Sequence, residues 1–251
     1  MRRLIKFAIP GLLFAFGVIA SGTTLTVTST IIGAGTAPDG GYGGEFGGYL
    51  NGNTANVVDV YCIDFSDAFN WGQTYTINVS TPPILTNTHL GGYTGTWEYD
   101  NGIYSAVQRY DMDGYLSSLI KPSNSQGTND AIVEAMWTLL DANVSLAPYS
   151  CSGESASACQ TAVSNDITTA FSNLSSFLAG NTITIYTDAN SRCTASGNSG
   201  SAPTTPGCMQ EFVAVSSNTS PVPEPSSFAL ISIGGALIGL GVLRLGKLAG
   251  K

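Results

Sequence analysis

Positive charge is scarce in this chain of 251 residues, and charge of either sign is uncommon. Only 10% of the residues are charged, whereas roughly 25% is usual for a soluble protein. Nine Lys and Arg stand against 17 Asp and Glu, which gives a formal net charge of −8. Proteins that bind the phosphates of nucleic acids need clustered basic residues, so the composition excludes nucleic acid as a partner.

Histidine is also scarce, since His89 is the one histidine of the chain. This excludes a multi-histidine metal centre and disfavours a histidine-based catalytic triad. The sequence has no G-x-S-x-G, H-E-x-x-H, Walker or C-x-x-C motif. Asp111-Met112-Asp113-Gly114 is similar to the start of a calcium loop, but Tyr115, Leu116 and Pro122 occupy positions where an EF-hand needs an oxygen ligand, Gly and Glu. We therefore expect these acids to lie in a turn, His89 to lie on the surface, and the protein to be a non-enzyme without metal or cofactor.

The few basic residues gather at the two ends of the chain. Six of the nine lie in the first six or the last eight positions: Arg2, Arg3, Lys6, Arg244, Lys247 and Lys251. Residues 21–243 hold the other three basic residues and all 17 acids, so their net charge is 3 − 17 = −14. The chain is therefore an acidic body between two basic tips.

The N-terminal tip has the three parts of a secretory signal. Basic residues within positions 2–6 precede an apolar run over residues 7–20, which ends in small residues at Ala20. This order predicts a signal peptide over residues 1–20, cleaved after Ala20. The alternatives, a buried N-terminal helix or an uncleaved anchor, agree less well with the order.

The C-terminal tip, residues 223–251, combines a short motif with an apolar segment and a basic end. Pro223-Glu224-Pro225 precedes an apolar run, and Arg244 and Lys247 follow it. With the serines before it, the run approaches the length of about 20 residues that a spanning helix needs. We predict a transmembrane helix at about 227–243, with Arg244 and Lys247 holding the tail on the cytoplasmic side. Residues 216–222 form a polar linker.

This tail resembles the PEP-CTERM sorting signal of Gram-negative bacteria, also called the ice-binding protein C-terminal domain. The resemblance implies that an exosortase-type transpeptidase recognises Pro223, Glu224 and Pro225. It also implies a host that makes exopolysaccharide or a biofilm matrix. The alternative is a chance match to the motif in front of an ordinary tail anchor.

Residues 21–215 are predicted to form one extracytoplasmic α+β domain. Alternating and β-branched patterns predict strands over residues 24–32, 57–65, 73–79, 182–187 and 210–215, and apolar periodicity predicts helices over about 103–120, 129–140 and 157–179. Asn129 or Asp130 is expected to cap the start of the second helix, and Gly180 occupies the expected C-cap position of the third. Strands, then helices, then strands predict an antiparallel sheet or sandwich with two to three inserted helices.

The body is also similar to bacterial surface domains that share a Tyr-Cys-Ile/Val-Asp strand and a Gln-x-Ala-Ile-Trp helix. Tyr61-Cys62-Ile63-Asp64 matches the strand, and Ala135-Met136-Trp137 is close to the end of the helix motif. In such thioester domains the strand Cys bonds to the helix Gln. Here Val133 occupies the Gln position, so the resemblance implies a related scaffold without thioester chemistry.

Five cysteines in an exported body predict disulfides. Short intervening segments favour Cys151–Cys159 and Cys193–Cys208. Cys62 then remains, and its position on an apolar strand predicts a buried thiol. The alternative is a reactive thiol, which the acidic neighbours of Cys62 disfavour.

These features predict an exported, exosortase-sorted protein of the cell surface or extracellular matrix, associated with exopolysaccharide. One alternative is a carbohydrate-binding or adhesive module, in which Trp71, Trp97 or Tyr42 stacks on sugar rings. Tyr42 belongs to the Gly-rich stretch 33–53, which we expect to be a loop, and its aromatic residues could instead pack that loop onto the domain. A further alternative is an extracellular hydrolase, although no carboxylate pair stands out for glycoside hydrolysis.

Overall fold

A computed structural model describes residues 22–36, 42–63, 70–85, 87–89, 103–140, 151–189 and 209–218 of the chain. The predicted signal peptide, the Cys193–Cys208 pair and the C-terminal sorting segment lie outside the described residues. The elements, in chain order, are β1 (Thr24–Thr36), β2 (Tyr42–Leu50), β3 (Val57–Cys62), β4 (Thr74–Ser80), α1 (Ala106–Ser117), α2 (Gln126–Leu140), α3 (Ala156–Gly180), β5 (Asn181–Asp188) and β6 (Phe212–Ser217).

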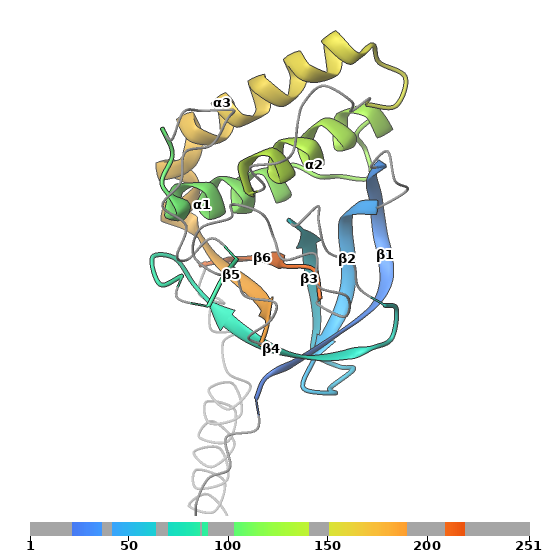
Figure 1. Cartoon of the computed structure of the whole chain (residues 1–251), viewed down its shortest axis with the longest axis vertical. Coiled ribbons are helices and arrows are strands. Elements are labelled where there is room, and N and C mark those ends of the chain that lie inside the picture. The colour runs from blue at the N-terminus through green and yellow to red at the C-terminus, as the bar shows by residue number, and fades with distance from the viewer. Residues whose placement is uncertain are drawn as a thin grey trace, which may run out of the picture.

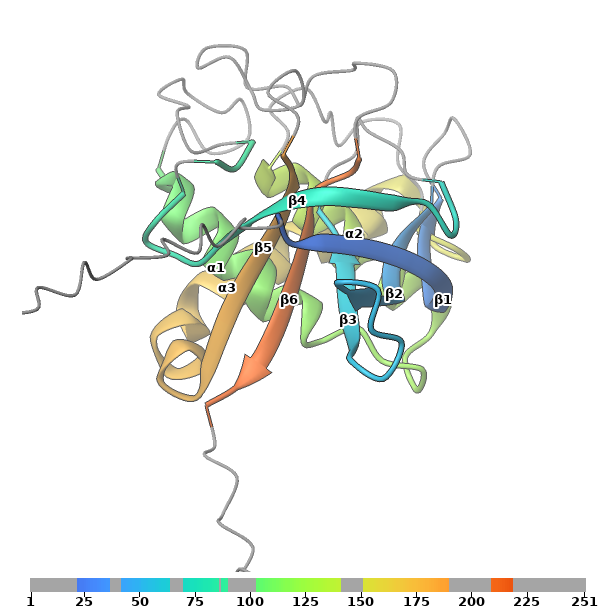
Figure 2. The same ribbon diagram turned by 90° about the horizontal axis from the view of Figure 1, so that it is seen from below.

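The six strands form one antiparallel sheet that closes on itself in the order β1-β2-β3-β6-β5-β4 (Figure 2). Closure depends on β1, which pairs with β2 along its length and with β4 through Thr24–Thr26. The predicted α+β class with an antiparallel sheet is confirmed. The sandwich alternative is wrong, because the strands make a single closed barrel.

The three helices lie together on one side of the barrel in two layers (Figure 1). Helix α2 packs over β1 and β2, and α1 packs over β5 and β6. Helix α3 forms the outer layer and packs against both α1 and α2. The core between barrel and helices includes wholly or almost wholly buried large side chains such as Trp137, Tyr110 and Phe46.

Serine side chains set the starts of the helices. Ser105 caps α1, and with Gln108 it forms a reciprocal capping box. Ser155 caps α3, and Ser125 Oγ accepts the Thr128 N–H at the start of α2. Helix α2 therefore begins at Gln126, before its predicted cap residues Asn129 and Asp130.

Asn129 and Asp130 are instead buried inside α2, where their side chains bind the loops beside it. Asn129 Oδ1 accepts the Lys121 N–H at 3.3 Å, and Asp130 Oδ2 accepts the Ser152 N–H at 2.9 Å. The predicted glycine cap of α3 is also wrong: Gly180 is the last helical residue, and the chain continues as an extended strand at Asn181.

The Gly-rich stretch that we expected to be a loop contains strand β2. Its glycines allow close contact with β1, since a Cβ added to Gly48 would lie 2.8 Å from the Thr26 carbonyl oxygen. A Cβ on Gly47 would lie 2.8 Å from Ser29 Oγ. Phe46 lies just before these two glycines; it is buried and packs against Phe212 of β6. Glycine here serves close backbone packing rather than loop flexibility.

No helix in the described part of the chain has the length and apolarity needed to cross a membrane. The transmembrane helix that we predict at about 227–243 falls outside that part.

Candidate functional site

A buried carboxylate joins three segments of the domain beneath α1. Glu211 Oε2 accepts a hydrogen bond from the Tyr110 hydroxyl at 2.6 Å, and its Oε1 accepts one from Thr187 Oγ1 at 2.6 Å. The main-chain N–H of His89 donates to the same Oε1 at 3.0 Å. We call these four residues the Glu211 cluster. Each hydrogen bond to a charged group contributes about 1.5–3 kcal/mol, so the cluster fastens α1, β5 and residues 87–89 to the start of β6.

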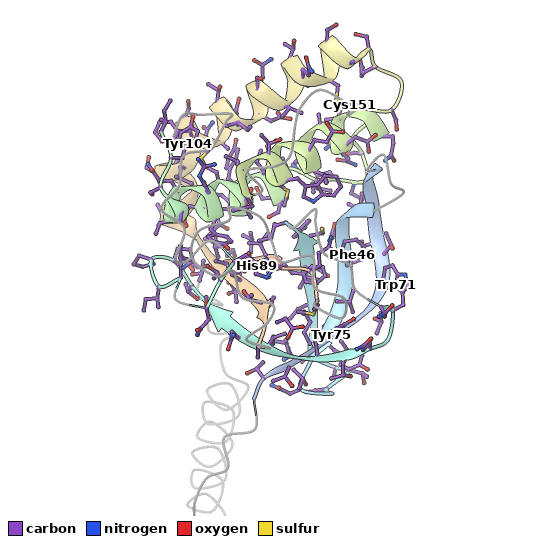
Figure 3. All side chains as sticks on the ribbon, viewed as in Figure 1. Phe46, Trp71, Tyr75, His89, Tyr104 and Cys151 are labelled. Carbon is purple, nitrogen blue, oxygen red and sulfur yellow. A yellow bond between two sulfur atoms is a disulfide. The ribbon has the colours of Figure 1, made fainter. Side chains whose placement is uncertain are left out.

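The expected surface position of His89 is wrong. Its side chain is 5% exposed and lies between the helices and the barrel (Figure 3). The Glu211 cluster explains this position, because the bond to the His89 main chain holds residues 87–89 against the core.

Asp111 and Asp113 lie inside helix α1, not in the turn that the sequence suggested. Asp113 is wholly buried, and its carboxyl oxygens have no hydrogen-bond partner among the described residues. Burial raises the pKa of Asp113 well above its usual value; the charge of Arg109 opposes this effect and that of Glu211 adds to it. Burial therefore favours the protonated, uncharged form of Asp113.

Arg109 is buried beside Asp113 and connects α1 to the end of α2. Its Nη1 donates to the Leu139 carbonyl at 2.9 Å, and its Nε donates to the Tyr104 carbonyl at 3.2 Å. These bonds satisfy part of the guanidinium group without a carboxylate. Arg109 thus acts as a structural tie between two helices.

Cys151 and Cys159 form a disulfide at the start of α3, with 5.3 Å between their Cα atoms. This is one of the two local pairs that the sequence suggested. Cys62 lies in β3, where its thiol is wholly buried, as expected of a core residue.

Glu134 of α2 lies beside this disulfide, with its Oε2 3.4 Å from Cys159 Sγ. Burial, followed by the charge of Asp130, raises the pKa of Glu134 to about 7. The ligand atoms of Glu134, Cys151 and Cys159 lie within 4.8 Å of one another. That spacing would suit a metal ion, but both sulfurs are bonded to each other, and a metal would need them as thiolates.

An open cavity of about 490 Å³ lies between α1, the end of α3, the start of β5, the end of β6 and the loop after β4. Asp111 lines it and is only 7% exposed. Burial alone raises the pKa of Asp111 to about 6. The cavity therefore holds a buried carboxylate that is largely ionised at neutral pH.

Trp71 lies at the turn before β4, in which Gly72 takes the left-handed region (φ 74°). Its ring is 55% exposed and packs against Phe46, with 5.8 Å between ring centroids (Figure 3). A half-exposed indole supported by a core ring is a possible surface for stacking. The side chains of Tyr42 and Trp97 fall outside the described residues.

The residues with predicted sorting roles, Ala20, Pro223, Glu224, Pro225, Arg244 and Lys247, are likewise not among the described residues. The structure adds Glu211 and Glu134, which the sequence did not single out, and it places Asp111 in the wall of a cavity rather than in a turn. For Asp111, the predicted helix over residues 103–120 did contain a signal of burial. Two acids two positions apart on a helix cannot both take its most exposed face.

Comparison of the chain with protein-family models, with curated proteins and with solved structures gives no match.

Proposed function

We propose that this is an exported, non-enzymatic protein of the cell surface or extracellular matrix, sorted through its C-terminal segment and associated with exopolysaccharide. The observation that carries the proposal is the order of three parts: a signal-like segment, an acidic body and the Pro223-Glu224-Pro225 tail with its apolar and basic ends. An exosortase-type transpeptidase is the partner that this order implies, and the tail helix is the membrane contact.

Two structural features support the proposal. The disulfide between Cys151 and Cys159 suits an oxidising compartment outside the cytoplasm. The barrel begins at Thr24 and ends at Ser217, so its strands lie between the two segments predicted to be processed. Removal of those segments would leave every strand of the barrel in place.

The test replaces the motif and follows the fate of the full-length precursor in a host with an exosortase-type transpeptidase. Changing Glu224 and Pro225 to Ala should leave the precursor unprocessed in the membrane, measured by cell fractionation and intact mass. Pro221→Ala, just outside the motif, is the matched control and should be processed normally. Equal processing of the motif variant and the wild type would refute sorting by this segment.

The exposed position of Trp71 favours one second candidate, a carbohydrate-binding or adhesive module. Aromatic rings with an exposed face and a rigid base suit stacking on a sugar ring. Trp71→Ala should then abolish retention on immobilised exopolysaccharide, while Trp71→Phe should retain part of it. Equal retention of wild type and Trp71→Ala would exclude this role for the residue.

A further inference from the structure

The cavity beside α1 contains a carboxylate with no partner of its own. Asp111 makes no hydrogen bond or ion pair with any described residue, and burial is the sole cause of its raised pKa. None of the described residues that line the cavity is basic, and Asp111 is the one acid among them. A largely buried charge without a partner is costly, so a ligand that brings positive charge would relieve this cost.

Two polar side chains that line the cavity with Asp111 offer hydrogen-bond acceptors. Asn181 uses its Nδ2 to donate to the Phe177 carbonyl at 2.9 Å, which leaves its Oδ1 as an acceptor. Thr182 donates its hydroxyl to Asn218 Oδ1, so that hydroxyl oxygen retains lone pairs. A group with several N–H donors therefore fits this wall better than a group with acceptors.

Apart from Thr81 and Asn218, the rest of the cavity wall is hydrocarbon. Val107 from α1, Leu178 from α3 and Ile183 from β5 line it, and Pro82-Pro83 closes the side towards β4. Such a wall suits a short alkyl chain. A bare divalent cation suits it poorly, since Ca²⁺ takes six to eight oxygen ligands.

We propose that this cavity binds an alkylammonium group, with the ammonium on Asp111 and Asn181 Oδ1 and the alkyl chain along Val107, Leu178 and Ile183. The ligand class comprises primary amines carried on a short aliphatic chain, either as a small molecule or as part of a polymer. The strongly acidic body would raise the local concentration of such cations. The inference does not depend on the sorting proposed above, because the purified protein can be tested for it directly.

The experiment titrates the purified full-length protein with n-butylammonium and follows the methyl signals of Val107, Leu178 and Ile183 by NMR. A ligand this small should bind with a Kd on the order of 1 mM. n-Butanol, which has the same shape without charge, should bind about tenfold more weakly, and butyrate should not bind.

Asp111→Asn should weaken butylammonium binding about tenfold or more. Asp166→Asn is the matched control, because burial also raises the pKa of Asp166 to about 6 but Asp166 lines a different cavity. Its binding should equal that of the wild type, and thermal melting should show that both variants are folded. The proposal is overturned if folded Asp111→Asn binds butylammonium as tightly as wild type, if butanol competes equally, or if the three methyl signals do not move.

Discussion

Replacement of Glu134 by Gln should make the protein more stable at alkaline pH. Glu134 is 2% exposed in α2, and its carboxyl touches the sulfur of Cys159 rather than a basic residue. Its pKa is raised from 4.5 to about 7 in the folded protein, mainly by burial and secondly by the charge of Asp130. Gln has nearly the same shape and cannot ionise, so the substitution removes the titration with little change in packing.

The sign of the effect follows from proton binding. Between pH 4.5 and about 7 the folded protein holds a proton on Glu134 that the unfolded chain has lost. The resulting stability is fully present below pH 4.5 and is lost as the pH rises through about 7. A pKa difference of about 2.5 corresponds to about 3 kcal/mol. The free energy of unfolding of Glu134→Gln minus that of the wild type should therefore be about 3 kcal/mol larger near pH 8 than near pH 4.

Urea unfolding of the oxidised full-length protein, repeated from about pH 4 to pH 8, gives the two free energies of unfolding to compare. Glu154→Gln is the control, because Glu154 is an exposed acid in the loop before α3. Its difference from wild type should vary little over this range. A difference between wild type and Glu134→Gln that does not change with pH would refute the argument from burial.

Three further predictions test the packing and bonding of the domain by the same unfolding measurement. Replacing Cys151 and Cys159 together by Ser should cost roughly 2–3 kcal/mol, since the disulfide closes a short loop; an unchanged midpoint would show that the bond does not restrain the unfolded chain. Tyr110→Phe removes a hydrogen bond to a buried carboxylate and should cost about 1.5–3 kcal/mol, and a loss below about 0.5 kcal/mol would mean that the bond is not made. Gly114→Ala would place a Cβ 2.5 Å from Ile183 Cδ1, and should cost about 1–3 kcal/mol. Ile183→Ala removes both Cδ1 and Cγ1, which would lie 2.5 and 2.6 Å from that Cβ, and should recover part of the loss in the double variant, whereas strictly additive losses would contradict the clash.

The elements with strong periodicity could be predicted from the sequence. The alternating residues of β4 and the apolar stripe of α3 each bury one face, and this requirement leaves a pattern in the chain. Strand β2 shows no such pattern in the sequence, because Gly47 and Gly48 occupy positions where a side chain would collide with β1. Such close backbone contact is a tertiary property, and the sequence of the strand shows only its glycines.

The buried polar residues were harder to predict than the fold. Asn129 and Asp130 have the residue types of helix caps. Each instead binds a loop outside α2, and the sequence of the helix alone does not show such a contact. The three residues that donate hydrogen bonds to Glu211 are separated from it in the sequence by 24, 101 and 122 positions. By contrast, Cys151 and Cys159 are eight residues apart, so spacing alone could suggest their disulfide.

The order of strands in the barrel has a consequence for the timing of folding. Strand β6 is the last to be synthesised, yet it lies between β3 and β5, and the segment just before it carries Glu211. Until about residue 217 has left the ribosome, β3 and β5 each lack a neighbour and Tyr110 lacks its acceptor. Folds that depend on such long-range pairing form slowly. The barrel of this topology therefore closes only after β6 has been synthesised, which is compatible with the proposed export of an unfolded chain.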